Sequence, residues 1–169
     1  MAVRGKVSAL LALETAFDGE MTAREAALIN GVVLGLSVAE ARARTEAVLA
    51  FAELEGQGSN LLRRFSSGMR ARLSFAIGAL SEPDVLLVDE VLAVGDEAFQ
   101  RKCHDRIRAL RERGTAVVFV SHDMRQIREL CTRVLWLAGG RIAGEGEPEQ
   151  VVAAYLASLA PRLARQSGA

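Results

Sequence analysis

Residues 84–123, DVLLVDEVLAVGDEAFQRKCHDRIRALRERGTAVVFVSHD, carry the strongest structural pattern in the chain. An apolar run at 85–88 is followed by a charged amphipathic segment at 97–113 and a second apolar run at 115–120. Short continuous apolar runs predict strands that are covered on both faces, and the charged segment between them predicts a helix. Strand, helix and strand in this order predict a right-handed crossover between parallel strands, so the sequence indicates an α/β fold.

Two N-terminal capping patterns predict a helical hairpin before this stretch. Thr22 is followed three residues later by Glu25, and Ser37 is followed by Glu40. At this spacing the hydroxyl and the carboxylate each accept a hydrogen bond from the backbone N–H of the other residue. We therefore expect helices from residue 22 to about 34 and from residue 37 to about 54.

The remaining predicted elements are shorter or less regular. Apolar residues at helical spacing predict a third helix over 66–80, which opens at Ser66-Ser67-Gly68. We further expect a buried strand at 7–13, a short helix at 123–131 capped by Asp123, a hairpin formed by 134–137 and 142–143, and a closing helix at 151–159.

Composition and charge exclude several functional classes. The chain has 169 residues, 50% hydrophobic and 25% charged, which is the balance of one ordinary globular domain. Lys+Arg and Asp+Glu number 21 each, so no basic field points to nucleic acid. The chain has no apolar run of the roughly 20 residues that a membrane-spanning helix needs. Its two cysteines are too few for a disulfide framework, so we expect a reducing, cytosolic compartment.

Polar residues follow both strands of the predicted crossover. Asp89 and Glu90 come directly after the first strand, and Ser121 and His122 come after the second. Ligands of open parallel sheets bind beyond the carboxyl ends of the strands. Taken singly, each of these residues is better interpreted as a solvated strand end or loop. Together they suit a carboxylate that holds hydrated Mg²⁺, a second that orients or deprotonates water, and an imidazole that contacts a terminal phosphate.

The segment FSSGM, residues 65–69, is a candidate anion site because it opens the third predicted helix. Exposed backbone N–H groups, hydroxyls and the positive end of a helix dipole favour an anion there, and a glycine lets the backbone approach closely. The alternative is a serine that only caps the helix. The segment on its own does not separate these two functions.

Taken together, these segments strongly resemble the carboxyl-terminal half of an ABC-transporter ATPase. FSSGM is similar to the signature motif, DVLLVDE to Walker B with its adjoining glutamate, LAVGD to the D-loop, and His122 to the H-loop histidine. Within that superfamily, GKVSALLALETAF and LWLAGGRIAGEGEPEQVVAAYL resemble ATPases that energise the export of polysaccharides, O-antigens and teichoic acids. The resemblance covers residues from about 5 to 156.

This resemblance implies the carboxyl-terminal portion of an ABC-type P-loop NTPase domain, an α/β fold whose parallel-sheet core carries a helical subdomain. Residues 1–169 would then form one partial domain. Its helical and signature subdomain would occupy about 22–80. The portion from Walker B to the H-loop, together with the closing helix, would occupy about 84–159.

The resemblance also implies site residues, with ATP and Mg²⁺ as cofactors. Glu90 would polarise the attacking water, His122 would contact the γ-phosphate, and Asp89 would support Mg²⁺ as the metal ligand. Asp96 would lie at a dimer interface and link the two nucleotide sites. The signature residues would bind nucleotide that is held by the opposite subunit: Ser66, Ser67, Gly68 and Met69.

The sequence departs from the family pattern in its phosphate loop. Walker A requires GxxxxGK followed by Ser or Thr. Lys6 follows Gly5 but precedes Val7, and Lys102 follows Arg101, so neither lysine completes this motif. The stretch 13–17 also lacks the glutamine of a Q-loop. We expect a truncated domain that by itself neither binds nor hydrolyses ATP appreciably.

The resemblance leads to one main functional hypothesis and three alternatives. The main hypothesis is the ATP-hydrolysing subunit of an exporter of cell-surface polysaccharide, O-antigen or teichoic acid. The implied partners are a second copy or a full-length ATPase subunit and an integral-membrane permease, which the hairpin at 22–54 would contact. The implied location is peripheral, on the cytoplasmic face of the inner or plasma membrane. The alternatives are a non-catalytic module that supplies the signature in trans, an inert fragment, and a DNA-repair-type ABC ATPase.

Overall fold

A parallel sheet organises the first of two compact units in the chain. The computed structural model describes residues 5–10, 17–89 and 95–166, and the units are Met1–Val120 and Ser121–Ala169. Among the described residues, the sheet of the first unit has the order β1 (Val7–Ala9), β2 (Val85–Asp89) and β3 (Ala116–Val120). Both pairs of neighbouring strands are parallel, which confirms the parallel pairing that the sequence predicts for β2 and β3.

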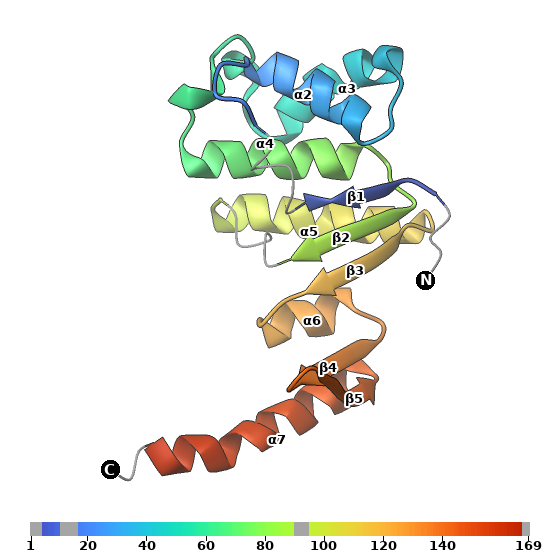
Figure 1. Cartoon of the computed structure of the whole chain (residues 1–169), viewed down its shortest axis with the longest axis vertical. Coiled ribbons are helices and arrows are strands. Elements are labelled where there is room, and N and C mark those ends of the chain that lie inside the picture. The colour runs from blue at the N-terminus through green and yellow to red at the C-terminus, as the bar shows by residue number, and fades with distance from the viewer. Residues whose placement is uncertain (1–4, 11–16, 90–94, 167–169) are drawn as a thin grey trace. The chain divides into compact units, whose positions relative to one another are not determined.

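The crossover from β2 to β3 passes through α5 (Glu97–Glu112), which confirms the predicted order of strand, helix and strand. The register pairs Val85 with Ala116 and Asp89 with Val120, so β2 and β3 end at the same edge of the sheet (Figure 1). Because β2 and β3 are direct neighbours, the residues that follow them begin from adjacent strand ends.

Burial of the strands differs from the sequence prediction. On β2, only Leu86 and Val88 are fully buried, while the alternate residues are partly exposed. Val118 and Val120, which share one face of β3, are 53% and 56% exposed, so this face of the strand is largely uncovered. The prediction that both strands are covered on both faces is therefore wrong for this structure. The strand predicted at 7–13 is observed over Val7–Ala9, and residues 11–13 lie outside the described residues.

The predicted helical hairpin is present as α2 (Ala23–Val33) and α3 (Val38–Phe51). Both capping boxes form: the N–H groups of Thr22 and Ser37 each donate to the carboxylate three residues later at 2.8 Å, and the two hydroxyls accept at 3.2 Å. Two short turns of 3-10 helix follow at Glu55–Gln57 and Leu62–Arg64.

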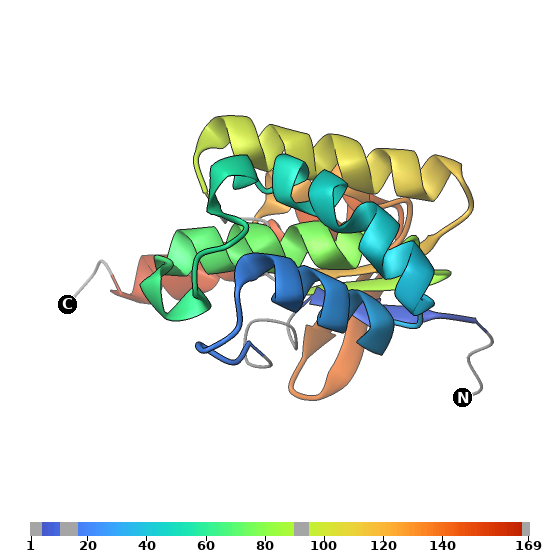
Figure 2. The same cartoon turned by 90° about the horizontal axis from the view of Figure 1, so that it is seen from above.

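Helix α4 (Ser67–Leu80) is the central element of this unit and begins where the sequence predicts. It lies between the α2–α3 pair and the sheet (Figures 1 and 2). Leu73, Ala76 and Ile77 join the core beneath α2 and α3. Phe75, which is fully buried, packs with Phe51 of α3 and Phe99 of α5, at ring-centroid distances of 5.9 and 6.4 Å. The buried face of α4 thus packs against both the helical layer, which is formed by α2 and α3, and α5.

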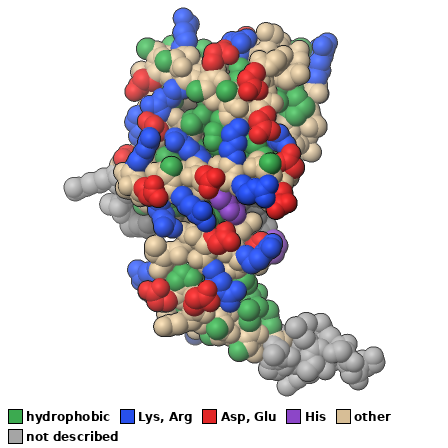
Figure 3. All heavy atoms as spheres, turned by 180° about the vertical axis from the view of Figure 1, so that it is seen from behind, with side chains coloured by type: hydrophobic (Ala, Val, Ile, Leu, Met, Phe, Trp, Pro, Cys, Tyr) green, Lys and Arg blue, Asp and Glu red, His purple; other side chains and the backbone are tan. Residues whose placement is uncertain are grey.

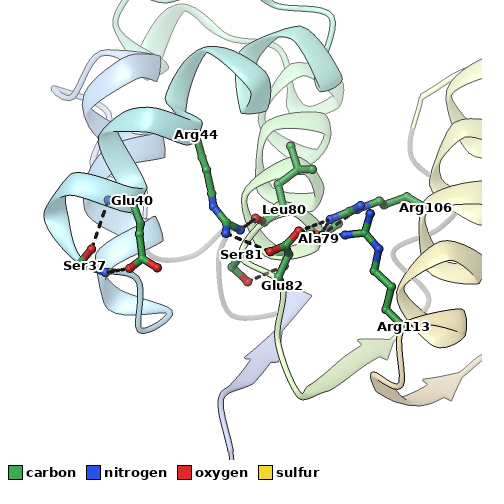
Figure 4. Close-up of polar contacts among 10 residues, drawn as sticks. Ser37, Glu40, Arg44, Ala79, Leu80, Ser81, Glu82, Arg106 and Arg113 are labelled. Carbon is green, nitrogen blue, oxygen red and sulfur yellow. Dashed lines mark hydrogen bonds and ion pairs between the residues drawn. The ribbon is translucent and has the colours of Figure 1, made fainter.

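The C-terminal end of α4 is held by arginines from two other helices (Figure 4). Arg44 of α3 donates to the carbonyl of Leu80 at 2.6 Å and to the Glu82 carboxylate at 3.0 Å. Arg106 of α5 donates to the carbonyl of Ala79 at 2.9 Å, and Arg113 donates to Glu82 at 3.1 Å. Cations at a helix C-terminus satisfy its last carbonyls and its dipole, so this cluster fixes α3, α4 and α5 to one another.

The second unit consists of α6 (Met124–Leu130), the hairpin β4 (Val134–Ala138) and β5 (Arg141–Gly146), and α7 (Pro148–Gln166). Asp123 caps α6 as predicted. Gly139 and Gly140 form the tight turn of the hairpin with φ of +56° and +73°. Trp136 and Tyr155 pack α7 onto the hairpin, and α7 begins and ends outside the predicted range 151–159.

The surface of the chain carries mixed charge. On the face that Figure 3 shows, cationic and anionic side chains are interspersed over the surface. In the described part of the chain, no helix has the length and apolar character needed to cross a bilayer.

Candidate functional site

The end of β2 places Asp89 at the carboxyl edge of the sheet. Asp89 is partly buried and lies in register with Val120, the last residue of β3. Glu90, the predicted catalytic carboxylate, lies outside the described residues. His122 follows β3 by two residues, is exposed, and belongs to the second unit, just before the cap of α6. The structure therefore aligns the two strand ends that lead into the predicted catalytic residues.

Asp89 fits Mg²⁺ as a protein ligand. Mg²⁺ is usually held by one or two carboxylates together with waters and substrate phosphates. A partly buried carboxylate at a strand end offers such a ligand. No group of three His, Cys, Asp or Glu side chains suited to a metal ion occurs among the described residues. One carboxylate at a strand end suits an ion that also binds a phosphate ligand.

The N-terminus of α4 presents the predicted anion-binding segment to solvent. Ser66 is the N-cap, and its hydroxyl accepts from the N–H of Met69 at 3.2 Å. Ser66 and Ser67 are exposed, while Gly68 and Met69 are partly buried. A side chain at Gly68 would meet only Ser66 Oγ, at 3.9 Å, so the space beside the backbone is open. The capping function is thus confirmed, and Ser66 and Ser67 are exposed at a helix N-terminus, a position that favours anions in general.

Asp96 begins α5 as its N-cap. One carboxylate oxygen accepts from the N–H of Phe99 at 2.9 Å, and the other accepts from Arg72 of α4 at 3.0 Å. The hydrogen bond from Phe99, followed by the charge of Arg72, holds the pKa of Asp96 below its usual value. Asp96 is therefore ionised at neutral pH. The stability that this ionisation contributes is lost as the pH falls through the lowered pKa.

Arg72 is a residue of this region that the sequence analysis missed. It lies four residues after Gly68 on α4, and its guanidinium joins Asp96 to Glu53, which follows the C-cap residue of α3. An arginine on a helix surface gives no sign of which distant carboxylates it meets, because both partners lie about twenty residues away in sequence. The structure thus connects two segments that the sequence analysis treats separately, the signature segment and Asp96.

Comparison with known proteins gives the same family as the motifs. The family model described as "ABC transporter" matches residues 2–93. The O-antigen export system ATP-binding protein RfbB of Klebsiella pneumoniae is 40% identical over 92% of this chain and 63% of its own length. RfbB of Myxococcus xanthus is 39% identical over 90% of this chain and 35% of its own length. ABC transporter protein AbcA of Aeromonas salmonicida is 42% identical over 89% of this chain and 49% of its own length.

Solved structures support the fold. The ATP-binding cassette MJ0796, in a dimeric post-hydrolysis state bound to ADP and Pi, has a TM-score of 0.70 at 23% identity and covers 85% of this chain and 63% of its own. The structure of an ATP-binding subunit of an ABC transporter has a TM-score of 0.77 at 21% identity. The match covers 89% of this chain and 62% of that protein. The chain spans between about a third and two thirds of the length of the relatives it matches. The family model, which matches more than half of the chain, shows that this chain belongs to the ABC transporter family.

Proposed function

We propose that the chain is part of the ATP-binding subunit of an exporter of O-antigen or another cell-surface polysaccharide, with teichoic acid as a further substrate class. The observation that supports this most is the identity of 38–40% to O-antigen export ATP-binding proteins over 90–92% of the chain. The position of the predicted Walker B segment supports it as well, because the strand of this segment ends at the carboxyl edge of a parallel sheet.

In this proposal the residues at the carboxyl ends of β2 and β3 take part in the hydrolysis of ATP to ADP and phosphate. Asp89 would hold Mg²⁺, which would supply positive charge beside the phosphate oxygens. Glu90 orients the attacking water and accepts its proton. His122 donates a hydrogen bond to the γ-phosphate. Closure and opening of a dimer around the nucleotide would drive the permease.

The open N-terminus of α4 is proposed to bind nucleotide held by a second subunit. The hydroxyls of Ser66 and Ser67 and the backbone beside Gly68 would contact its γ-phosphate, with Met69 beside them. Asp96 would lie at the interface between the subunits. The Walker B and signature segments of one chain would therefore serve different nucleotide sites, so either can be disabled without the other.

The helical layer is proposed to contact the permease, which would place the subunit on the cytoplasmic face of the membrane. Large apolar side chains are exposed on α2 and at the start of α3. Val33 is 73% exposed and Val38 is 58% exposed, and Ile29 is 42% exposed. Exposed large apolar side chains on two neighbouring helices favour a protein partner.

The 169 residues contain no Walker A motif, so nucleotide binding would need a phosphate loop from outside them. We propose that these residues alone do not turn over ATP. A second candidate function follows from the intact N-terminus of α4: a non-catalytic module that supplies this segment to a P-loop-bearing subunit.

The substitution Ser67→Glu tests the proposed phosphate contact. A carboxylate in the first turn should stabilise α4 by about 0.3–1 kcal/mol, because it complements the helix dipole. It should also repel the γ-phosphate and weaken ATP-dependent association with a P-loop-bearing subunit by roughly 10²-fold. Urea unfolding measures the first effect, and sedimentation velocity with ATP measures the second.

The matched control is Ser59→Glu, at an exposed serine in the loop between the two 3-10 turns. This variant should associate like the unmodified chain. If Ser67→Glu also associates normally while its fold is intact, the N-terminus of α4 does not bind the nucleotide.

A further inference from the structure

Four helices of the first unit end on a residue with left-handed backbone, and they do so in two different ways. Helices α2 and α5 are followed by Gly35 and Gly114, with φ of +93° and +94°. Helices α3 and α4 are followed by Glu53 and Glu82, with φ of +60° and +52°. Among the described residues, these two glutamates are the only non-glycine residues with positive φ. Glycine is the residue that this position favours, because any side chain is strained there.

The end of α3 does not itself need a glutamate. The N–H of Glu53 donates to the carbonyl of Ala50 at 3.2 Å, and the N–H of Leu54 donates to that of Leu49 at 2.9 Å. After α5 the same pair of hydrogen bonds forms around Gly114, at 3.0 and 3.1 Å. The chain therefore makes the same helix ending with glycine elsewhere, and the strained glutamate must be explained by its side chain.

The carboxylate of Glu53 holds cations from two neighbouring helices. One oxygen accepts from Arg72 of α4 at 2.6 Å, and the other lies 3.5 Å from the ammonium of Lys102 of α5. The Arg72 side chain is only 20% exposed and its guanidinium lies 4.8 Å from the centre of the Phe99 ring. Glu82, which follows the C-terminal end of α4, likewise binds cations from two other segments: its carboxylate accepts from Arg44 and Arg113 (Figure 4).

Arg72 in turn fixes the backbone at the start of α5. Its second terminal nitrogen donates to Asp96 at 3.0 Å. A side chain at Gly95, where φ is +78°, would lie 3.0 Å from Arg72 Nε and 3.2 Å from Phe99 Cβ. The guanidinium thus packs directly against Gly95 while it binds Asp96, and its rigid fork allows it to hold both carboxylates at once.

We propose that Glu53 is a positioning residue, which holds Arg72 and through it sets the position of Gly95 and Asp96 relative to α4. The strained backbone at the end of α3 is retained because a glycine would end the helix but could not hold the guanidinium. Through this link, a shift of the end of α3 would move α4 and the start of α5 with it. Its consequence for ATP-dependent dimerisation rests on the function proposed above.

The direct test is Glu53→Gly in the 169-residue chain, which relieves backbone strain and removes the carboxylate. The readout is hydrogen exchange at the Phe99 amide, which donates to Asp96, relative to the Ile107 amide in the middle of α5. We expect the exchange rate of the Phe99 amide, divided by that of the Ile107 amide, to rise about three- to tenfold. The reason is that Arg72, the partner of Asp96, is no longer fixed by Glu53. Arg72→Lys should raise the ratio in the same way, since an ammonium cannot hold two carboxylates as a fork does.

The matched controls are Glu53→Gln and Glu55→Gln, which remove the same charge from residues two positions apart. Glu53→Gln should raise the ratio, and Glu55→Gln, at an exposed residue, should leave it unchanged. A helix-end effect on α3 alone would not reach an amide on α5. An unchanged ratio in Glu53→Gly overturns the proposal, whatever happens to the urea midpoint.

ATP-dependent association with a P-loop-bearing subunit provides a second readout. Glu53→Gly should weaken it about three- to tenfold, because Asp96 at the proposed interface is no longer fixed. If the unmodified chain does not associate at all, the proposed function is wrong, and the exchange ratio still decides the role of Glu53. If the unmodified chain associates and Glu53→Gly associates equally well, the positioning role at the interface is wrong.

Discussion

Glu90→Gln should slow ATP turnover on the order of 10²–10⁴-fold in a protein that carries these residues behind a P-loop in the same chain. Glutamine keeps the size and hydrogen-bonding capacity of Glu90 but cannot accept a proton from the attacking water. Asp89, the proposed Mg²⁺ ligand at the end of β2, is unchanged in this variant. ATP should therefore still bind, and the measurement is steady-state phosphate release together with nucleotide affinity.

The matched control for this prediction is Glu112→Gln, at the exposed end of α5 far from the strand ends. It should leave the rate of phosphate release unchanged. If Glu90→Gln retained the rate of the unmodified protein, Glu90 would not be the catalytic carboxylate, and the resemblance of DVLLVDE to Walker B would not extend to catalysis.

Phe75→Ala should lower the free energy of unfolding by about 3–5 kcal/mol. Phe75 is fully buried and packs between Phe51 and Phe99, so its removal leaves a cavity where three helices meet. Domains of this kind are stable by about 5–15 kcal/mol, so the variant should unfold at markedly lower urea concentration. Urea unfolding followed by circular dichroism measures the change.

Val118→Ala serves as the comparison for this second prediction. Val118 is 53% exposed on β3, and its truncation should cost no more than about 0.5 kcal/mol. Equal losses in the two variants would contradict the burial pattern, in which α4 and its aromatic neighbours form the core and β3 is an exposed strand.

The elements that sequence predicts best are those specified by local chemistry. The capping boxes at Thr22 and Ser37 and the helix start at Ser66 are written in residues three positions apart, and all three are found in the structure. The parallel crossover is also confirmed, because it follows from alternating apolar and amphipathic segments. The caps depend on hydrogen bonds within one helical turn, and the crossover is predicted from side-chain spacing along three consecutive segments.

The features that sequence reasoning missed depend on contacts between distant segments. An apolar run such as 115–120 does not reveal whether its strand is central or at an edge, and β3 is an edge strand among the described residues. The sequence does not indicate that Glu53 has left-handed backbone, because glycine is the residue expected at such a position after a helix. Its partner Arg72 is likewise unspecified until α3, α4 and α5 are assembled. The assignments of Glu90, His122 and the signature residues stay predictions.

The central claim, that one chain contributes its signature and Walker B segments to different nucleotide sites, can be tested in a mixed complex. The 169-residue chain is combined with a P-loop-bearing family subunit whose own signature segment has been inactivated, and phosphate release is measured. Each component alone should give no turnover, and the mixture should restore it. Ser67→Glu in the chain should abolish the restored turnover, and Glu90→Gln in the chain should leave it intact. Failure of the mixture to hydrolyse ATP, or loss of turnover with Glu90→Gln, would contradict the account.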